Sequence, residues 1–192
     1  MRLRLHHTLI SSLLTIAILL PAPGRADTTG ATVDDEARLD PGGTGAEVID
    51  TAYAPPKAVF DFYFDDPRHI DSALHWLRSL MNPLSAEPYG LTPEQMEIKV
   101  VIHGTEIVAL AHKNYAKYRD AVERMRYYAG FGVEFKVCGI AAHDYGYTPE
   151  DFYDFVQVVP SAITELAHWQ MQGFGLITPT MMDKRYSIEE IR

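Results

Sequence analysis

The chain contains one cysteine, Cys138, whose position points to thiol chemistry. A strand-like run over residues 133–137 precedes it and Gly139 follows it, so it lies where open α/β sheets bind ligands. A partly exposed thiol, with its pKa lowered by a cation or a helix N-terminus, could attack sulfane sulfur and carry a persulfide. The alternative is a core residue, because free cysteine is among the most buried residue types. Position alone leaves both interpretations open.

Two other chemistries use side chains at the same predicted edge. His103, Cys138 and His143 could hold a metal ion or haem, but no zinc-binding spacing occurs in the sequence, and we predict no metal site. Asp65 with Asp66, or Asp144 with His143, could act as acid and base, although a role in starting a helix explains Asp65 and Asp66 better. Nucleotide-binding motifs and the G-x-S-x-G elbow are absent, and we predict no cofactor.

Three predicted strands deliver these side chains. Residues 58–64, 97–104 and 133–137 are rich in β-forming residues and end at Asp65, at Gly104 and at the cysteine. Apolar residues recur at helical spacing over residues 67–81 and 115–128, which predicts two helices between the strands.

The rest of the sequence continues this alternation. Residues 105–110 are ambiguous, and a short helix is the first choice. A hydroxyl cap, a proline and two acids at residues 148–151 predict the start of another helix. A final helix is predicted over 162–172, with an inner face of Ile163, Leu166, Ala167 and Gln170, and a closing strand over 174–179.

This order predicts an α/β fold, a three-layer sandwich with a mainly parallel sheet and crossovers on both faces. The C-terminal ends of the first three strands should then converge on one edge. We therefore expect Asp65, His103, Gly104 and Cys138 to lie close together.

The N-terminus predicts export. Residues 1–26 combine a basic start, a short apolar run and small residues before Asp27, the pattern of a signal peptide, which favours a periplasmic protein. Residues 27–56 have few large apolar residues and are predicted to be a flexible arm, followed by one domain over 57–192. Residues 1–26 carry three arginines and no acid, so their removal takes the charge from −9 to −12, with 14 Lys and Arg against 26 Asp and Glu. Such a protein repels nucleic acid and anionic membranes.

Three segments together resemble the DsrE/DsrF-like family. They are Val-Val-Ile-His-Gly at 100–104, Gly-Val-Glu-Phe-Lys-Val-Cys at 132–138, and the stretch from Val158 to Phe174. The resemblance implies a small α/β sandwich assembled as a trimer or hexamer, with a cysteine that carries persulfide sulfur between proteins. Cys138 matches that cysteine by position, and His103 and Gly104 match the His-Gly turn of the family. The well-studied relay members are cytoplasmic, whereas this chain carries an export signal.

The function predicted from these observations is a periplasmic sulfur carrier, without turnover of its own, that uses Cys138 and His103. Further ligand-binding candidates are Gly104, Gly139, His143 and Asp65. The partners would be a sulfur donor or acceptor protein, or a small sulfur compound, with neither nucleic acid nor membrane involved. The alternatives are a non-catalytic module that binds a small ligand or metal, and an oligomeric structural subunit.

Overall fold

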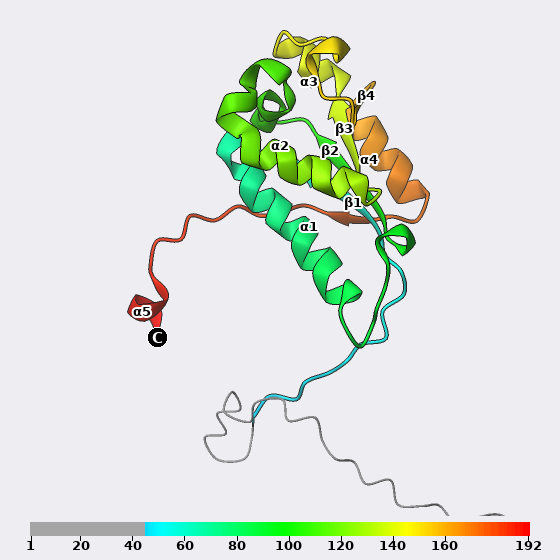
Figure 1. The fold of residues 1–192 in the computed structure, drawn as a ribbon, viewed down its shortest axis with the longest axis vertical. Helices are drawn as coiled ribbons and strands as arrows, with labels where there is room; N and C mark the ends of the chain where they lie inside the picture. The colour runs from blue at the N-terminus through cyan, green and yellow to red at the C-terminus, as the bar shows by residue number, and fades with distance from the viewer. Residues whose placement is uncertain (1–44) are drawn as a thin grey trace, which may run out of the picture. The chain divides into compact units, whose positions relative to one another are not determined.

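Parallel strands form the centre of the domain (Figure 1), in the order β4-β3-β2-β1-β5. The computed structural model describes residues 45–192, so the predicted signal peptide and residues 27–44 of the predicted arm lie outside the described residues. Residues 45–56 have no helix or strand. The strands are β1 (Lys57–Phe62), β2 (Glu97–Ile102), β3 (Glu134–Cys138), β4 (Val156–Val159) and β5 (Gly175–Ile177). All pairings within this sheet are parallel, as predicted.

Helices cover both faces of the sheet. The helices are α1 (Ile70–Ser85), α2 (Tyr115–Gly130), α3 (Gly139–Asp144), α4 (Ala162–Met171) and α5 (Ile188–Ile191). Helices α1 and α2 bury the larger apolar core against one face, and α4 packs over the other. The three-layer α/β fold is confirmed. None of the helices described over residues 45–192 is long and apolar enough to cross a membrane.

The alternation of side chains along β2 explains how the layers divide. Ile98, Val100 and Ile102 belong to the core beneath α1 and α2, whereas Val101 packs with residues of α4 and Lys99 lies over the ring of Trp169 in α4. Successive residues of a strand point to opposite faces, so this is the expected two-residue period.

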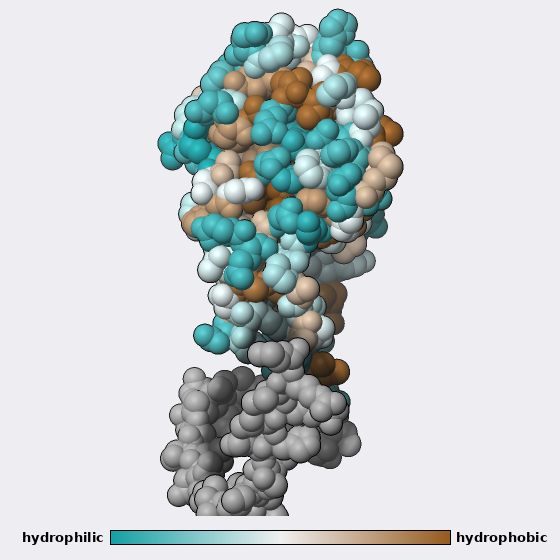
Figure 2. Space-filling model, turned by 90° about the vertical axis from the view of Figure 1, so that its right-hand side faces the viewer, coloured by the Kyte–Doolittle hydropathy of each residue, from teal (hydrophilic) through white to brown (hydrophobic). Residues whose placement is uncertain are grey.

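A layer of buried charge lies between the sheet and α4. The Nζ of Lys136 in β3 lies 3.1 Å from Oε2 of Glu134 and 3.4 Å from Oε1 of Glu165 in α4. The same Nζ donates to Oε1 of Gln157 at 2.6 Å. Lys99 also pairs with Glu134. Buried charges cost free energy unless they are paired, and each of these two lysines has a carboxylate partner. Seen from the side of α4, the outer surface mixes hydrophilic and hydrophobic residues (Figure 2).

The first helix ends later than the sequence suggested. The predicted helix ends at residue 81, but α1 continues to Ser85 with Pro83 inside its last turn. Proline removes one backbone N–H from a helix, yet the burial of Leu84 and the bond from the Ala86 N–H to the Asn82 carbonyl hold this turn in place.

The prediction that a helix starts at Thr148 is wrong. The Thr148–Asp151 capping box starts only a single 3-10 turn, η6 (Pro149–Asp151), and the chain then enters β4. Val158 and Val159 are β-branched and pair with β3, so a sheet position displaces the helix that the local signal favoured.

Candidate functional site

A cavity of about 610 Å³ opens at the C-terminal edge of the sheet. Its volume is within the range of small-ligand sites. Its walls come from the loops after β1 and β2, from α3, and from the segment after β5. They are formed by Tyr63, Phe64, Asp65, His69, His103, Gly104, Thr105, Ala141, Asp144, Tyr145, Pro179 and Met181. The predicted residues Asp65, His103 and Gly104 are thus brought together.

Two contacts hold the side chain of His103 in this wall. Its Nε2 lies 2.8 Å from Oδ1 of Asp61, and both side chains are largely buried. Its ring stacks on Tyr63, with centroids 4.6 Å apart. With Nε2–H donating this hydrogen bond to the Asp61 carboxylate, Nδ1 is the ring nitrogen that can accept a proton. The contacts therefore orient an imidazole that can act as a base.

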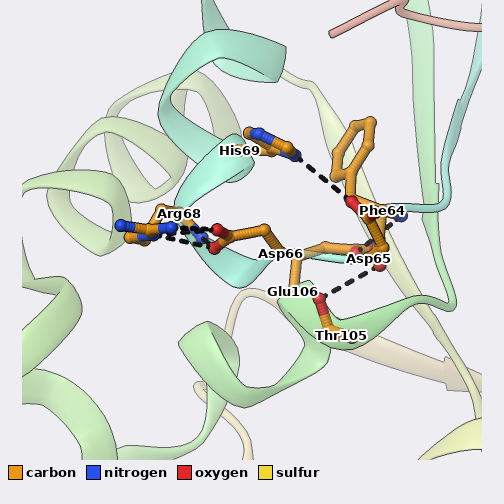
Figure 3. Close-up of polar contacts among 7 residues, drawn as sticks. All are labelled: Phe64, Asp65, Asp66, Arg68, His69, Thr105 and Glu106. Carbon is orange, nitrogen blue, oxygen red and sulfur yellow. Dashed lines mark hydrogen bonds and ion pairs between the residues drawn. The ribbon is translucent and has the colours of Figure 1, made fainter. Parts of the chain in front are cut away.

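Behind the cavity wall lies a buried carboxylate, Glu106 (Figure 3), at the start of the 3-10 helix η4 (Thr105–Leu110). Its Oε2 accepts from the Phe64 N–H at 3.1 Å and its Oε1 from the Gly104 N–H at 2.9 Å. The Thr105 hydroxyl donates to the Phe64 carbonyl at 3.0 Å. Burial raises the pKa of Glu106, and the backbone N–H groups oppose that rise. Glu106 thus joins the two loops that carry Asp65 and His103.

Gly104 is required by the same close approach. A Cβ at this position would lie 2.5 Å from the Phe64 nitrogen and 2.6 Å from Oε2 of Glu106. Any larger residue would therefore push the β1 and β2 loops apart, so the His-Gly turn has a packing reason.

The loop after β1 divides its acids between two roles (Figure 3). Asp66 caps the 3-10 helix η2 (Pro67–His69) through the Arg68 N–H at 2.8 Å and pairs with the Arg68 guanidinium. The side-chain bond to Arg68 lowers the pKa of Asp66 to about 2. Asp65 is exposed, and its Oδ1 lies 3.7 Å from Nδ1 of His69. This buried nitrogen has no hydrogen-bond partner within residues 45–192.

Cys138 lies beside this cavity but does not line it. The residue is 5% exposed and packs with Val59, Val101, Ala162, Leu166 and Phe174. Ile102 and Val137 are the last pair of the β2–β3 register, and His103 and Cys138 are the residues that directly follow them. Both lie on the α4 face of the sheet by the two-residue period. The thiol is therefore a lateral neighbour of His103, beneath the start of α4.

The two other predicted ligand residues lie away from the cavity wall. A Cβ on Gly139 would lie 2.9 Å from the Val159 carbonyl oxygen, so its small size admits the neighbouring strand. The His143 side chain is 91% exposed, and its neighbour Asp144 lines the cavity instead. No group of three or more metal-ligating side chains able to hold a metal ion occurs within residues 45–192.

Sequence reasoning missed Asp61, His69 and Glu106 as parts of the site. Two of them carry a signal in hindsight, since Asp61 interrupts an apolar strand and Glu106 precedes an apolar run. A charge inside a buried segment requires a partner, and here the partners are His103 and the two backbone N–H groups.

Comparison with known proteins identifies the fold. A family model described as the DsrE/DsrF-like family matches residues 68–179. A solved structure of a protein of unknown function from Methanobacterium thermoautotrophicum is 22% identical with a TM-score of 0.52. The match covers 65% of this chain and 99% of that one, and at this identity it shows a shared fold alone. No curated protein matches the sequence.

Proposed function

Because the chain belongs to the DsrE/DsrF-like family, we propose that it binds or transfers sulfane sulfur through Cys138. The observation that carries this proposal is that the β2–β3 pairing ends at Ile102 and Val137, directly before His103 and Cys138, and that Asp61 fixes the His103 ring at the cavity edge. A thiol needs a base or a cation nearby to become a thiolate at neutral pH, and a histidine oriented by a carboxylate can supply one.

The proposed reaction is an exchange of sulfur without net oxidation. His103 accepts the Cys138 proton, and the thiolate attacks the outer sulfur of a persulfide donor, R–S–SH. The donor S–S bond breaks, a new S–S bond forms at Cys138, and R–S⁻ leaves and takes up a proton. An acceptor thiolate then attacks the outer sulfur of the Cys138 persulfide, and the Cys138 thiolate leaves.

We place this carrier in the periplasm on the basis of its N-terminal sequence, with a small sulfur compound or a donor or acceptor protein as partner. In an oxidising compartment a lone cysteine also has the option of an intersubunit disulfide. A covalent dimer on a non-reducing gel would reveal that use.

The second candidate is a small-ligand module in which Cys138 is only a core residue. Two observations favour it: Cys138 is almost fully buried, and it is not one of the residues that line the cavity. In that case ligand binding depends on His103 and its neighbours, and Cys138→Ala leaves binding unchanged.

Intact mass after incubation with inorganic polysulfide separates the candidates. The carrier gains one or more sulfur atoms that dithiothreitol removes, and it passes them to an added small thiol. Cys138→Ser gains none, and His103→Gln gains them more slowly. If His103→Gln loads at the wild-type rate, then His103 is not the base; if the folded wild type gains no sulfur, then the carrier proposal fails.

A further inference from the structure

Two parts of the cavity wall lie outside the family match: the loop after β1, before residue 68, and the segment after β5. The matched region ends at residue 179, and Met181 lies beyond it. The segment that carries Met181 follows β5, the edge strand that pairs with β1. Its position next to β1 brings it to the loop that carries Asp65.

Burial shows that this segment is packed against the domain. Pro179 is buried and Met181 is half-buried against the main apolar core, whereas Thr178, Thr180 and Met182 are exposed. This alternation is that of an extended chain with one inward face. Pro179 and Met181 contribute that inward face to the cavity.

The next residues continue along α1. Met182 and Lys184 line a shallow hollow with Asp71, Ser72, His75 and Trp76 of that helix. In Figure 1 the chain after β5 crosses the domain at the level of α1 before it reaches α5. The chain is therefore anchored on both sides of Met181. Strand β5 pairs with β1 before it, and Met182 and Lys184 line the α1 hollow after it.

We infer that Met181 is a specificity-determining residue of this cavity, and that its side chain sets the size of the ligand that reaches His103. Methionine is long and unbranched, so it fills irregular space and adapts to the molecule beside it. The ligand class rests on the proposed function: compact sulfane-sulfur compounds, such as inorganic polysulfide or short alkyl persulfides, enter, and bulky persulfides are excluded.

The test measures access to His103 without using Cys138. The full-length protein is treated with diethyl pyrocarbonate, and the modification rate of each histidine is followed by peptide mass spectrometry. Met181→Ala should raise the rate at His103 about threefold, because it removes a flexible wall side chain. Met181→Trp should lower the rate.

Matched controls lie in the same chain. Met182→Ala changes the adjacent, 84% exposed methionine and should leave the His103 rate at the wild-type value. His143, exposed and outside the cavity wall, should react equally in every variant.

Equal His103 rates in Met181→Ala and Met182→Ala would overturn the inference, and so would a parallel rise at His143, which indicates general loosening. Because the readout does not involve the thiol, a failure here is distinct from a failure of sulfur loading at Cys138.

Discussion

At the scale of single residues, Glu106 shows how one side chain holds the site together. Its two oxygens each accept a backbone N–H, one from Phe64 and one from Gly104. A buried carboxylate is costly to desolvate, and here it offsets the cost by satisfying two donors that would otherwise be buried without acceptors. The residue at position 106 must therefore accept two hydrogen bonds, one at each terminal atom of its side chain.

Replacing Glu106 by Gln should destabilise the protein. The glutamine amide presents one acceptor and one NH₂ group, so one backbone N–H faces a donor, at a cost of about 1–3 kcal/mol. Urea unfolding measures the loss, and Glu189→Gln, at an exposed position in α5, is the control. Equal stability of Glu106→Gln and wild type would contradict this account of the loop.

Asp66 should make unfolding pH-dependent in acid. Its side-chain bond to Arg68 lowers its pKa to about 2, from an ordinary value of 3.8. A lowered folded-state pKa contributes stability that is present above the unfolded value and is lost as the pH falls from about 3.8 through about 2. The Asp66→Asn variant should lose less stability than the wild type over this window, as followed by thermal unfolding. Parallel curves for the two proteins would argue against the pair.

At the scale of elements, the helical and strand periods of the sequence predicted most of the fold. The apolar residues that recur at helical spacing over 115–128 form the buried face of α2. The strands predicted over 97–104 and 133–137 form as β2 and β3, with β2 ending two residues earlier than predicted. β4 was missed because it depends on pairing with β3, a long-range contact that the local capping signal at Thr148 does not report.

The inner face of α4 was predicted only in part. Leu166 is buried as expected, but Ile163, Ala167 and Gln170 are exposed. The helix instead turns Glu165 and Trp169 toward Lys136 and Lys99 of the sheet. Apolar spacing alone could not indicate this face, because the strands beneath α4 carry buried lysines.

Replacing two glycines by alanine distinguishes a glycine required by close packing, Gly104, from one that is not, Gly130. Gly104→Ala places a Cβ against the backbone of Phe64 and should cost about 1–3 kcal/mol of stability, as overpacking does. Gly130→Ala in α2 meets no atom within 4 Å and should stabilise by up to about 1 kcal/mol, because alanine is the better helix former. Chemical unfolding of both variants provides the comparison, and a tolerated Gly104→Ala would refute the close approach.

At the scale of the whole molecule, the two faces of the sheet are covered unequally. Two long helices cover one face and α4 alone covers most of the other, where α4 exposes Ile163 and Met171 and β5 exposes Leu176. The family resemblance implies trimers or hexamers, and we propose that these side chains lie in the contact between copies.

Light scattering should therefore report a trimer or hexamer for the wild type. Ile163→Lys should lower the measured mass, because a charge in an apolar contact is costly to bury. Tyr127→Lys, on the exposed side of α2, serves as the control and should leave the mass unchanged. A wild-type monomer would contradict the proposed assembly.

The most direct test of the central claim is the rate at which Cys138 gains sulfur from polysulfide in the folded protein, compared with the rate in urea-unfolded protein. The account predicts that the folded protein loads at least as fast, because His103 and the cavity edge serve the thiol only in the native state. Loading that occurs only after unfolding would make Cys138 a core residue and would contradict the sulfur-carrier function.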